Sequence, residues 1–220
     1  MKVYTDSSDF IKEKNIVITV GSFDGLHKGH FKIIDELLKK SSEVNGKSVL
    51  LTFEPHPRQV VSKDNTIQIL TTLEEKKNLL EKAGVDFLIV QNFTREFSEM
   101  TSDEFIKKVL VNDIGASHIV VGHDHKFGRD RLGDADKLKL LGDNYGFGVT
   151  SVDAEKINSE IISSTVIRKA LADGDIEKAN LFFGRNYSFG GIVVKGAQRG
   201  RTLGFPTANI KLDDPKKLIP

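Results

Sequence analysis

Residues 16–30 read IVITVGSFDGLHKGH, and they carry the most specific structural pattern of the chain. The first five residues are apolar or β-branched, which predicts a strand buried on both faces. The rest predicts a turn into a helix, whose free N–H groups and positive dipole end favour a phosphate. Gly25 and Gly29 allow backbone and ligand to approach closely. His27 and His30 can donate hydrogen bonds to oxygens that gain charge when an α-phosphorus is attacked.

Outward from this junction, short apolar runs alternate with amphipathic stretches. Helices are predicted over residues 29–44, before Gly84, after a cap at Thr101 or Ser102, and around Leu138. Such alternation predicts an α/β fold, a Rossmann-like doubly wound parallel sheet, with ligands bound beyond the carboxyl ends of its strands. The predicted strands cover residues 16–20, 48–53, 86–90, 118–121 and 148–152.

The pattern changes near Gly184. Two short helices, at 164–172 and 176–182, precede a glycine-rich segment with a strand-like run at 191–194. The net charge changes from −4 over residues 1–183 to +5 over residues 184–220. We therefore expect an α/β domain at 1–183 followed by an incomplete β-barrel module at 184–220. These last 37 residues are fewer than the ~40 with which a chain folds alone.

Composition excludes several classes of protein. The 220 residues contain no cysteine, so a disulfide scaffold, a Cys-ligated metal site and a thiol nucleophile are excluded. A net charge of +1 argues against a general nucleic-acid binder. No apolar run approaches the ~18 residues of a membrane span, and residues 1–10 lack the apolar core of a signal peptide. We expect a cytoplasmic protein without nucleic-acid or membrane partners, and no pattern specifies an oligomeric state.

A second group of polar residues, Ser163, Ser164 and Thr165, leads into the helix at 164–172. Hydroxyls at a helix start satisfy free amides and can also bind phosphate oxygens. Arg168 follows one turn later, where its guanidinium could bind a phosphate. Taken alone, the segment is equally compatible with a simple helix cap and a surface arginine.

Two further loops follow predicted strands. Residues 122–129 include Asp124, His125 and Phe127. A His-x-His metal site is the weaker interpretation here, because no cysteine or carboxylate cluster accompanies it, and a ligand-lining loop is favoured. The other loop includes Phe53, His56 and Arg58, which could stack on a planar ring, although an ordinary loop is equally compatible.

Together, these four segments resemble the bacterial bifunctional riboflavin kinases/FMN adenylyltransferases, the prokaryotic FAD synthetases. The family motifs are G-x-F-D-G-x-H-x-G-H, T-F-x-P-H-P, V-G-x-D-F-x-F-G and I-S-S-T-x-I-R. Residues 191–196 and 199–209 resemble the start of the riboflavin kinase module, whose P-T-A-N segment binds ATP and magnesium. His125 stands where the family usually has phenylalanine.

This resemblance implies a nucleotidyltransferase of the H-x-G-H type that transfers AMP from ATP to FMN, giving FAD and pyrophosphate. It also implies an ATP-dependent riboflavin kinase and a need for Mg²⁺. Its motifs assign catalysis to His27, His30 and Arg168. They assign ATP binding to Gly21, Ser22, Phe23, Asp24, Gly29, Ser163, Ser164 and Thr165. They assign flavin binding to Phe53, His56, Arg58, Asp124 and Phe127. In the kinase module they assign nucleotide binding to Lys195, Gly196, Thr207 and Asn209, and Mg²⁺ binding to Thr207 and Asn209.

The kinase barrel of the family continues beyond Pro220, so we expect this chain to make FAD from FMN but no FMN from riboflavin. Two alternatives stay open at this point. Another H-x-G-H adenylyltransferase, acting on pantetheine phosphate or a pyridine nucleotide, would lack the kinase-like residues 199–209. A non-catalytic flavin or nucleotide carrier would not need His27, His30 and Arg168 intact.

Overall fold

The computed structural model describes residues 1–62, 67–197 and 199–220. Its main feature is a six-stranded sheet in the order β1-β4-β3-β2-β5-β6, in which every neighbouring pair is parallel. The predicted α/β class and all five predicted strands are confirmed. The edge strand β1 was not predicted because its three residues are too few for a periodic signal. The strands are β1 (Lys2–Tyr4), β2 (Ile16–Val20), β3 (Lys47–Glu54), β4 (Phe87–Asn92), β5 (Ala116–Gly122) and β6 (Gly148–Val152).

Strand β2 is the switch point of the sheet. It pairs with β3 on one side and β5 on the other, so the chain winds outward from β2 in two directions. All five residues of β2 are buried, as its apolar sequence predicts. In doubly wound sheets the crevice beyond the carboxyl ends of such strands holds the ligand. Here that crevice is formed by the segments that follow β2, β3 and β5.

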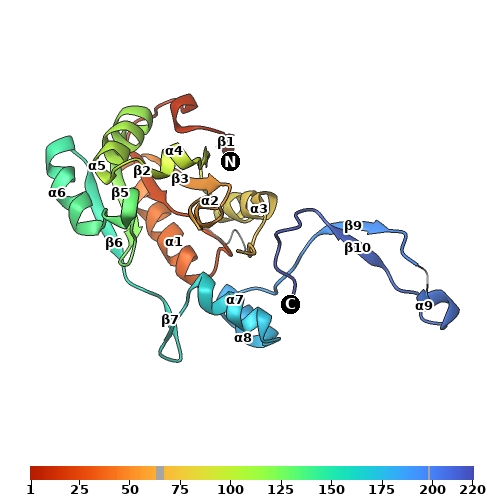
Figure 1. Cartoon of the computed structure of the whole chain (residues 1–220). Coiled ribbons are helices and arrows are strands. Elements are labelled where there is room, and N and C mark those ends of the chain that lie inside the picture. Colours follow the sequence, from red (N-terminus) through yellow and green to blue (C-terminus); the bar gives the residue numbers. More distant parts are fainter. Residues whose placement is uncertain (63–66, 198) are drawn as a thin grey trace.

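Helices cover both faces of the sheet (Figure 1). Leu50 and Leu88 belong to the core beneath α1 and α3, whereas Val49 and Leu51 pack in the core that includes η2 and α6. Successive strand residues therefore alternate between two hydrophobic cores, because side chains alternate across a strand. The helices are α1 (Lys28–Glu43), α3 (Leu73–Ala83), η2 (Phe105–Ile114) and α6 (Ala135–Tyr145).

The third predicted helix differs from expectation in its pitch. Thr101 forms a reciprocal capping box with Glu104, and a short α-helix, α5, spans Ser102–Glu104. The chain then continues as a π-helix, η2, which ends at Gly115 with φ 75°. Its buried residues Phe105, Ile106, Val109, Leu110 and Ile114 all face the core.

Several short elements surround the crevice or lie beyond it. Both helices predicted after Ser163 are present, with caps at Ser163 and Asp175. The other short elements were not predicted, because two to five residues carry little periodicity. They are η1 (Ser7–Asp9), α2 (Pro57–Val61), α4 (Arg95–Ser98), η3 (Arg129–Arg131), β7 (Lys156–Ile157) and β8 (Glu160–Ile161), beside the predicted α7 (Ser164–Ala172) and α8 (Ile176–Phe183).

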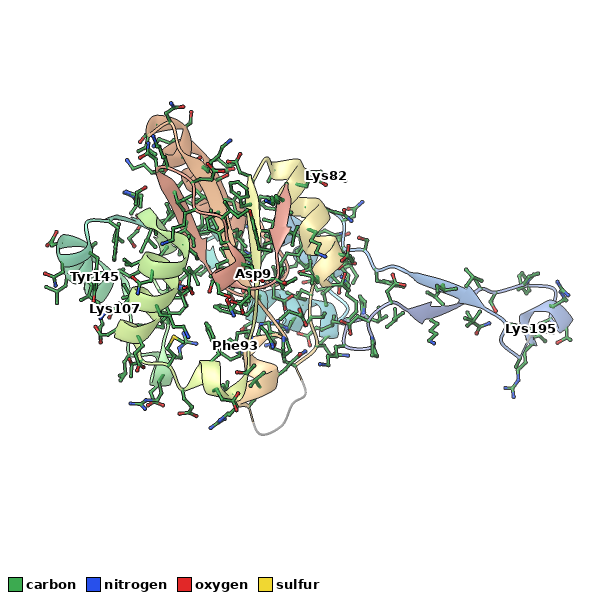
Figure 2. The ribbon with its side chains drawn as sticks, turned by 90° about the horizontal axis from the view of Figure 1, so that it is seen from above. Asp9, Lys82, Phe93, Lys107, Tyr145 and Lys195 are labelled. Atoms are coloured by element: carbon green, nitrogen blue, oxygen red, sulfur yellow. The ribbon has the colours of Figure 1, made fainter. Side chains whose placement is uncertain are left out.

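The segment after Gly184 forms an antiparallel hairpin that projects from the α/β body (Figures 1 and 2). It consists of β9 (Gly191–Val194) and β10 (Asn209–Leu212), with the short helix α9 (Arg199–Thr202) between them. Both strands are largely exposed. The chain then returns to the body, where Lys217 and Leu218 are buried.

Candidate active site

A cleft of about 760 Å³ lies beyond the carboxyl ends of β2, β3 and β5. This volume is within the usual range for small-molecule sites. Five of the six histidines of the chain line it. Of the residues predicted for the adenylyltransferase, all except Asp24 line this one cleft. They are Gly21, Ser22, Phe23, His27, Gly29, His30, Phe53, His56, Arg58, Asp124, Phe127, Ser163, Ser164, Thr165 and Arg168.

The turn between β2 and α1 holds a strained backbone. Phe23 and Leu26 have φ values of 44° and 39°, which bulky residues rarely adopt, and Gly25 has φ 94°. A side chain on Gly25 would also lie 2.9 Å from the Leu70 side chain. Such strain persists only where surrounding contacts enforce it. Here Arg185 provides two of them, donating to the carbonyls of Gly25 at 2.6 Å and Leu26 at 2.7 Å.

His27 and His30 form a stacked pair at the start of α1. Their ring centroids lie 3.6 Å apart, and Phe23 contacts His30 edge-on at 5.1 Å. His27 Nδ1 accepts a hydrogen bond from the backbone amide of His30 at 3.3 Å, so the proton of the neutral ring is on Nε2. Burial lowers the pKa of His27 to about 4 and holds the pKa of His30 well below its usual value. Both rings are therefore neutral near pH 7 and can donate hydrogen bonds without carrying charge.

Asp24 is buried behind the cleft, where its carboxylate pairs with Arg168. It also accepts hydrogen bonds from the backbone amides of Leu70 and Thr71 and from the Thr71 hydroxyl. Arg168 lines the cleft and donates through Nε to the Gln68 carbonyl at 2.8 Å. The structure thus places Asp24 against the arginine that lines the cleft, and outside the cleft lining itself.

Two helix N-termini open into the same cleft. The first turn of α1 contributes Gly29 and His30, and the first turn of α7 contributes Ser164 and Thr165. Ser164 Oγ donates to the Asp24 carbonyl at 2.8 Å, which fixes α7 against the turn of residues 21–27. The positive ends of two helix dipoles therefore converge on one volume, as expected of a site for a polyanion.

Lys76 is a buried residue near the site that the sequence analysis missed. Its ammonium donates to the Ser22 carbonyl at 2.7 Å and to Thr52 Oγ1 at 2.9 Å. Burial lowers the pKa of Lys76 to about 8. The lysine holds the backbone beneath Ser22 in place, from the side of α3. The sequence signal that could have identified it is its spacing, three residues after Leu73 and four before Leu80, which places it on the apolar face of α3.

An aromatic wall forms the other side of the cleft. Phe53, Phe93 and Phe97 contact one another with centroid distances of 5.3, 5.9 and 5.6 Å. His125 stacks on Phe127 at 5.7 Å, so the histidine in the usual phenylalanine position keeps an aromatic contact. Phe93 and Phe97 were missed, although Phe93 directly follows β4 (Figure 2), a position where a ligand residue is expected.

Histidines on this side are held neutral as well. Burial lowers the pKa values of His56 and His125 to about 4. His56 Nδ1 caps α2 by accepting from the Arg58 amide at 3.2 Å. Among the described residues, no group of three or more histidine or acidic side chains is arranged to hold a metal ion.

The residues predicted for the kinase module do not line the cleft. They lie in the segment that forms the hairpin, and Figure 2 shows Lys195 on its projecting part. Lys195 and Gly196 follow β9, and Asn209 begins β10 opposite Val194. Gly196 lies so close to the Asn209 amide group that a side chain at Gly196 would require Asn209 to move. Thr207 lies near Gly200.

This doubly wound sheet, with paired histidines and two helix N-termini at its switch point, defines a nucleotidyltransferase-like α/β protein. A family model described as FAD synthetase matches residues 10–166, and one described as riboflavin kinase matches residues 183–220. The chain belongs to the FAD synthetase family.

Curated relatives share the name bifunctional riboflavin kinase/FMN adenylyltransferase. The protein from Haemophilus influenzae is 40% identical over 89% of this chain and 63% of its own length. The one from Listeria monocytogenes is 38% identical over 91% and 63%, and that from Escherichia coli K12 is 36% identical over 91% and 64%. The chain therefore spans somewhat less than two thirds of the relatives that it matches.

Solved structures show the same fold. A structure described as a macrolide-efflux protein from Streptococcus pneumoniae has a TM-score of 0.88 and 30% identity, covering 99% of this chain and 70% of that one. Pantoate-beta-alanine ligase from Francisella tularensis has a TM-score of 0.53 and 17% identity, covering 84% and 78%. The descriptions as an efflux protein and as a ligase apply to those two proteins, and the likeness to this chain is one of fold. In the described part of this chain, no helix has the length and apolar character needed to cross a membrane.

Proposed function

We propose that the α/β domain, residues 1–183, transfers AMP from ATP to FMN, producing FAD and pyrophosphate. The observation that carries this proposal is the cleft itself. It places a neutral histidine pair, the starts of α1 and α7 and Arg168 beside an aromatic wall. A polyanion and a planar ring system are the two features of these substrates that such a site would recognise.

In this reaction an oxygen of the FMN phosphate attacks the α-phosphorus of ATP. A new P–O bond forms, the bond to the oxygen bridging the α- and β-phosphorus breaks, and pyrophosphate leaves with that oxygen. Two anions must approach in line, so positioning and charge neutralisation provide most of the catalysis. The chain needs no covalent intermediate for this transfer.

The residues divide these tasks by their protonation state. His27 Nε2–H and the His30 ring donate hydrogen bonds to phosphate oxygens as neutral groups, since burial keeps both pKa values low. Positive charge comes from Arg168, whose position Asp24 fixes, and from the helix N-termini. Ser163 and Thr165 complete the phosphate side, and the backbone of Gly21, Ser22 and Phe23 lines the nucleotide, as does Gly29.

The flavin ring lies against the aromatic wall in this proposal. Phe53 and Phe127 supply apolar surface, and the missed residues Phe93 and Phe97 extend it. His56, Arg58 and Asp124 line the same side and would contact the FMN phosphate or ring edge.

Magnesium enters this reaction with its substrate, as MgATP. Asp24, in the same turn as the histidines, already accepts hydrogen bonds from four donors. Within residues 1–62, 67–197 and 199–220, no group of three or more histidine or acidic side chains could hold the ion, so in this proposal it is bound through phosphate and water. Octahedral Mg²⁺ keeps phosphate and water ligands readily. The histidines and Arg168 act on phosphate oxygens in every step above.

We further propose that residues 184–220 begin a riboflavin kinase module that makes FMN from riboflavin and ATP. The hairpin brings Lys195 and Gly196 beside Asn209, which supports a shared nucleotide site. Thr207 and Asn209 would contribute oxygen ligands to its Mg²⁺. The cytoplasm is the compartment in which we place both reactions.

The test is to incubate the purified chain with FMN and MgATP and to measure FAD and pyrophosphate together. Equimolar FAD and pyrophosphate are expected. Pantetheine phosphate and nicotinamide mononucleotide serve as control acceptors, because a product with either would support another adenylyltransferase. Tight binding of FMN and ATP without pyrophosphate release would overturn the proposal in favour of a carrier.

A further inference from the structure

We propose that Lys217, together with the backbone of residues 216–218, positions Arg168 of the nucleotide site through the segment of residues 68–71. Lys217 lies in the C-terminal segment that returns from the hairpin and does not line the cleft. It is therefore a positioning residue, and this role rests on the adenylyl transfer proposed above.

The backbone of residues 68–71 is bonded on two sides. Arg168 donates to the carbonyl of Gln68, and Asp24 accepts from the amides of Leu70 and Thr71. The C-terminal segment bonds to Ile69 from the opposite side. The Ile69 amide donates to the Lys216 carbonyl at 2.9 Å, and the Leu218 amide donates to the Ile69 carbonyl at 2.9 Å. Residues 68–71 therefore hydrogen-bond both to the nucleotide site and to the C-terminal segment.

Lys217 adds side-chain contacts to these backbone hydrogen bonds. Its ammonium, 3% exposed, donates to the Leu70 carbonyl at 2.7 Å and to Glu75 Oε2 at 2.6 Å. The same Leu70 donates its amide to Asp24. One residue therefore joins Lys217 on one side to the Asp24–Arg168 pair on the other. Removing the ammonium would leave a buried carbonyl without its donor, next to the residues that orient Arg168.

A second contact holds the same C-terminal segment. The Tyr187 hydroxyl donates to the Leu218 carbonyl at 2.6 Å, and its ring lies 4.7 Å from the Lys217 ammonium. Tyr187 stacks on Phe183 at 5.4 Å, and Arg185, which binds the strained turn at Gly25, lies over the same Phe183 ring. The C-terminal segment is thus packed against both supports of the site.

The test compares Lys217→Met with Lys216→Met in the whole chain. Lys216 is the matched control, because its side chain is exposed and bonds to Gln59 at 3.0 Å, while its backbone contact with Ile69 remains in the variant. For Lys217→Met we expect KM for ATP to rise and kcat/KM to fall at least tenfold, with KM for FMN within twofold of the parent. A displacement of about 1 Å at a positioning group is enough for losses of this order.

Two measurements separate positioning from mere stability. In a double-mutant cycle with Arg168→Lys, the two losses in kcat/KM are expected to be clearly less than multiplicative, because both act on one guanidinium. Fully multiplicative losses, or a Lys217→Met variant within twofold of the parent below its melting temperature, overturn the proposal. If Lys217→Met does not fold, Tyr187→Phe decides, with a smaller rise in KM for ATP expected and no rise overturning the proposal. Failure of the parent chain to make FAD would instead refute the proposed function.

Discussion

Replacing Asp24 with asparagine tests how the site is supported. In the folded protein the two carboxylate oxygens accept from the amides of Leu70 and Thr71, the Thr71 hydroxyl and Arg168. Asparagine has one acceptor oxygen, so its NH₂ group must face either Arg168 or a backbone amide, which are both donors. Either orientation leaves the partly buried Arg168 without its counter-charge. Breaking a buried pair by removing one partner costs about 3–5 kcal/mol.

For a chain of this size, about 1 kcal/mol lowers the melting temperature by roughly 2–4 °C, so we expect Asp24→Asn to lower it by roughly 6–20 °C. Differential scanning calorimetry measures this directly. Asp35→Asn is the matched control, because Asp35 is exposed on α1. A fall no larger than that of the control would refute the assignment of Asp24 as the internal anchor. Binding of MgATP, measured by titration below the melting temperature, should weaken in parallel.

The other predictions address the cleft. His30→Ala should lower the turnover of FAD formation by roughly 10²- to 10³-fold, as for loss of one oxyanion-type donor, while His118→Ala, outside the cleft, serves as control; activity within tenfold of the parent would remove His30 from catalysis. Arg168→Lys should reduce kcat/KM more than tenfold, because an ammonium cannot form both the bond to Gln68 and the pair with Asp24 in the same geometry; equal activity would show that only charge matters. The free energy of unfolding should fall as pH is lowered from ~6.5 to ~4. The reason is that His27 and His56 bind protons near pH ~6.5 in the unfolded chain but only near pH 4 in the folded chain. Together the two residues contribute a slope of up to about 2.7 kcal/mol per pH unit. Urea denaturation at several pH values measures this slope, and a flat profile would contradict the burial of the neutral rings.

Most of the α/β sheet was predictable from the sequence because each buried strand is a continuous β-branched or apolar run. The location of the cleft was predictable for the same reason. Once the strands are parallel, the residues after β2, β3 and β5 must meet at one edge of the sheet. The grouping of His27, Phe53 and Asp124 around one volume follows from topology alone, without any knowledge of loop structure.

The direction in which individual side chains point was not predictable. Asp24 lies within the same motif as His27 and His30, and no local pattern distinguishes a carboxylate that faces a ligand from one that faces the protein. Its partners are distant in the sequence: Arg168 is 144 residues away, and the amides of Leu70 and Thr71 are 46 and 47 residues away. The contacts of Lys76 were not predictable for a similar reason, because its partners Ser22 and Thr52 belong to other elements.

The contacts of the C-terminal segment with the α/β body were not predictable from the sequence either. The shift in charge and glycine content near Gly184 predicts two modules by composition, and the hairpin of β9 and β10 follows that position in the chain. Amino-acid composition alone does not indicate which part of the α/β body a later segment packs against. Residues 216–218 return to pair with Ile69, and Lys217 reaches Leu70 across 147 residues of sequence. Under the proposed function, the segment that starts the kinase-like module also supports the nucleotide site, and a cut at residue 183 is expected to remove part of that support together with the hairpin.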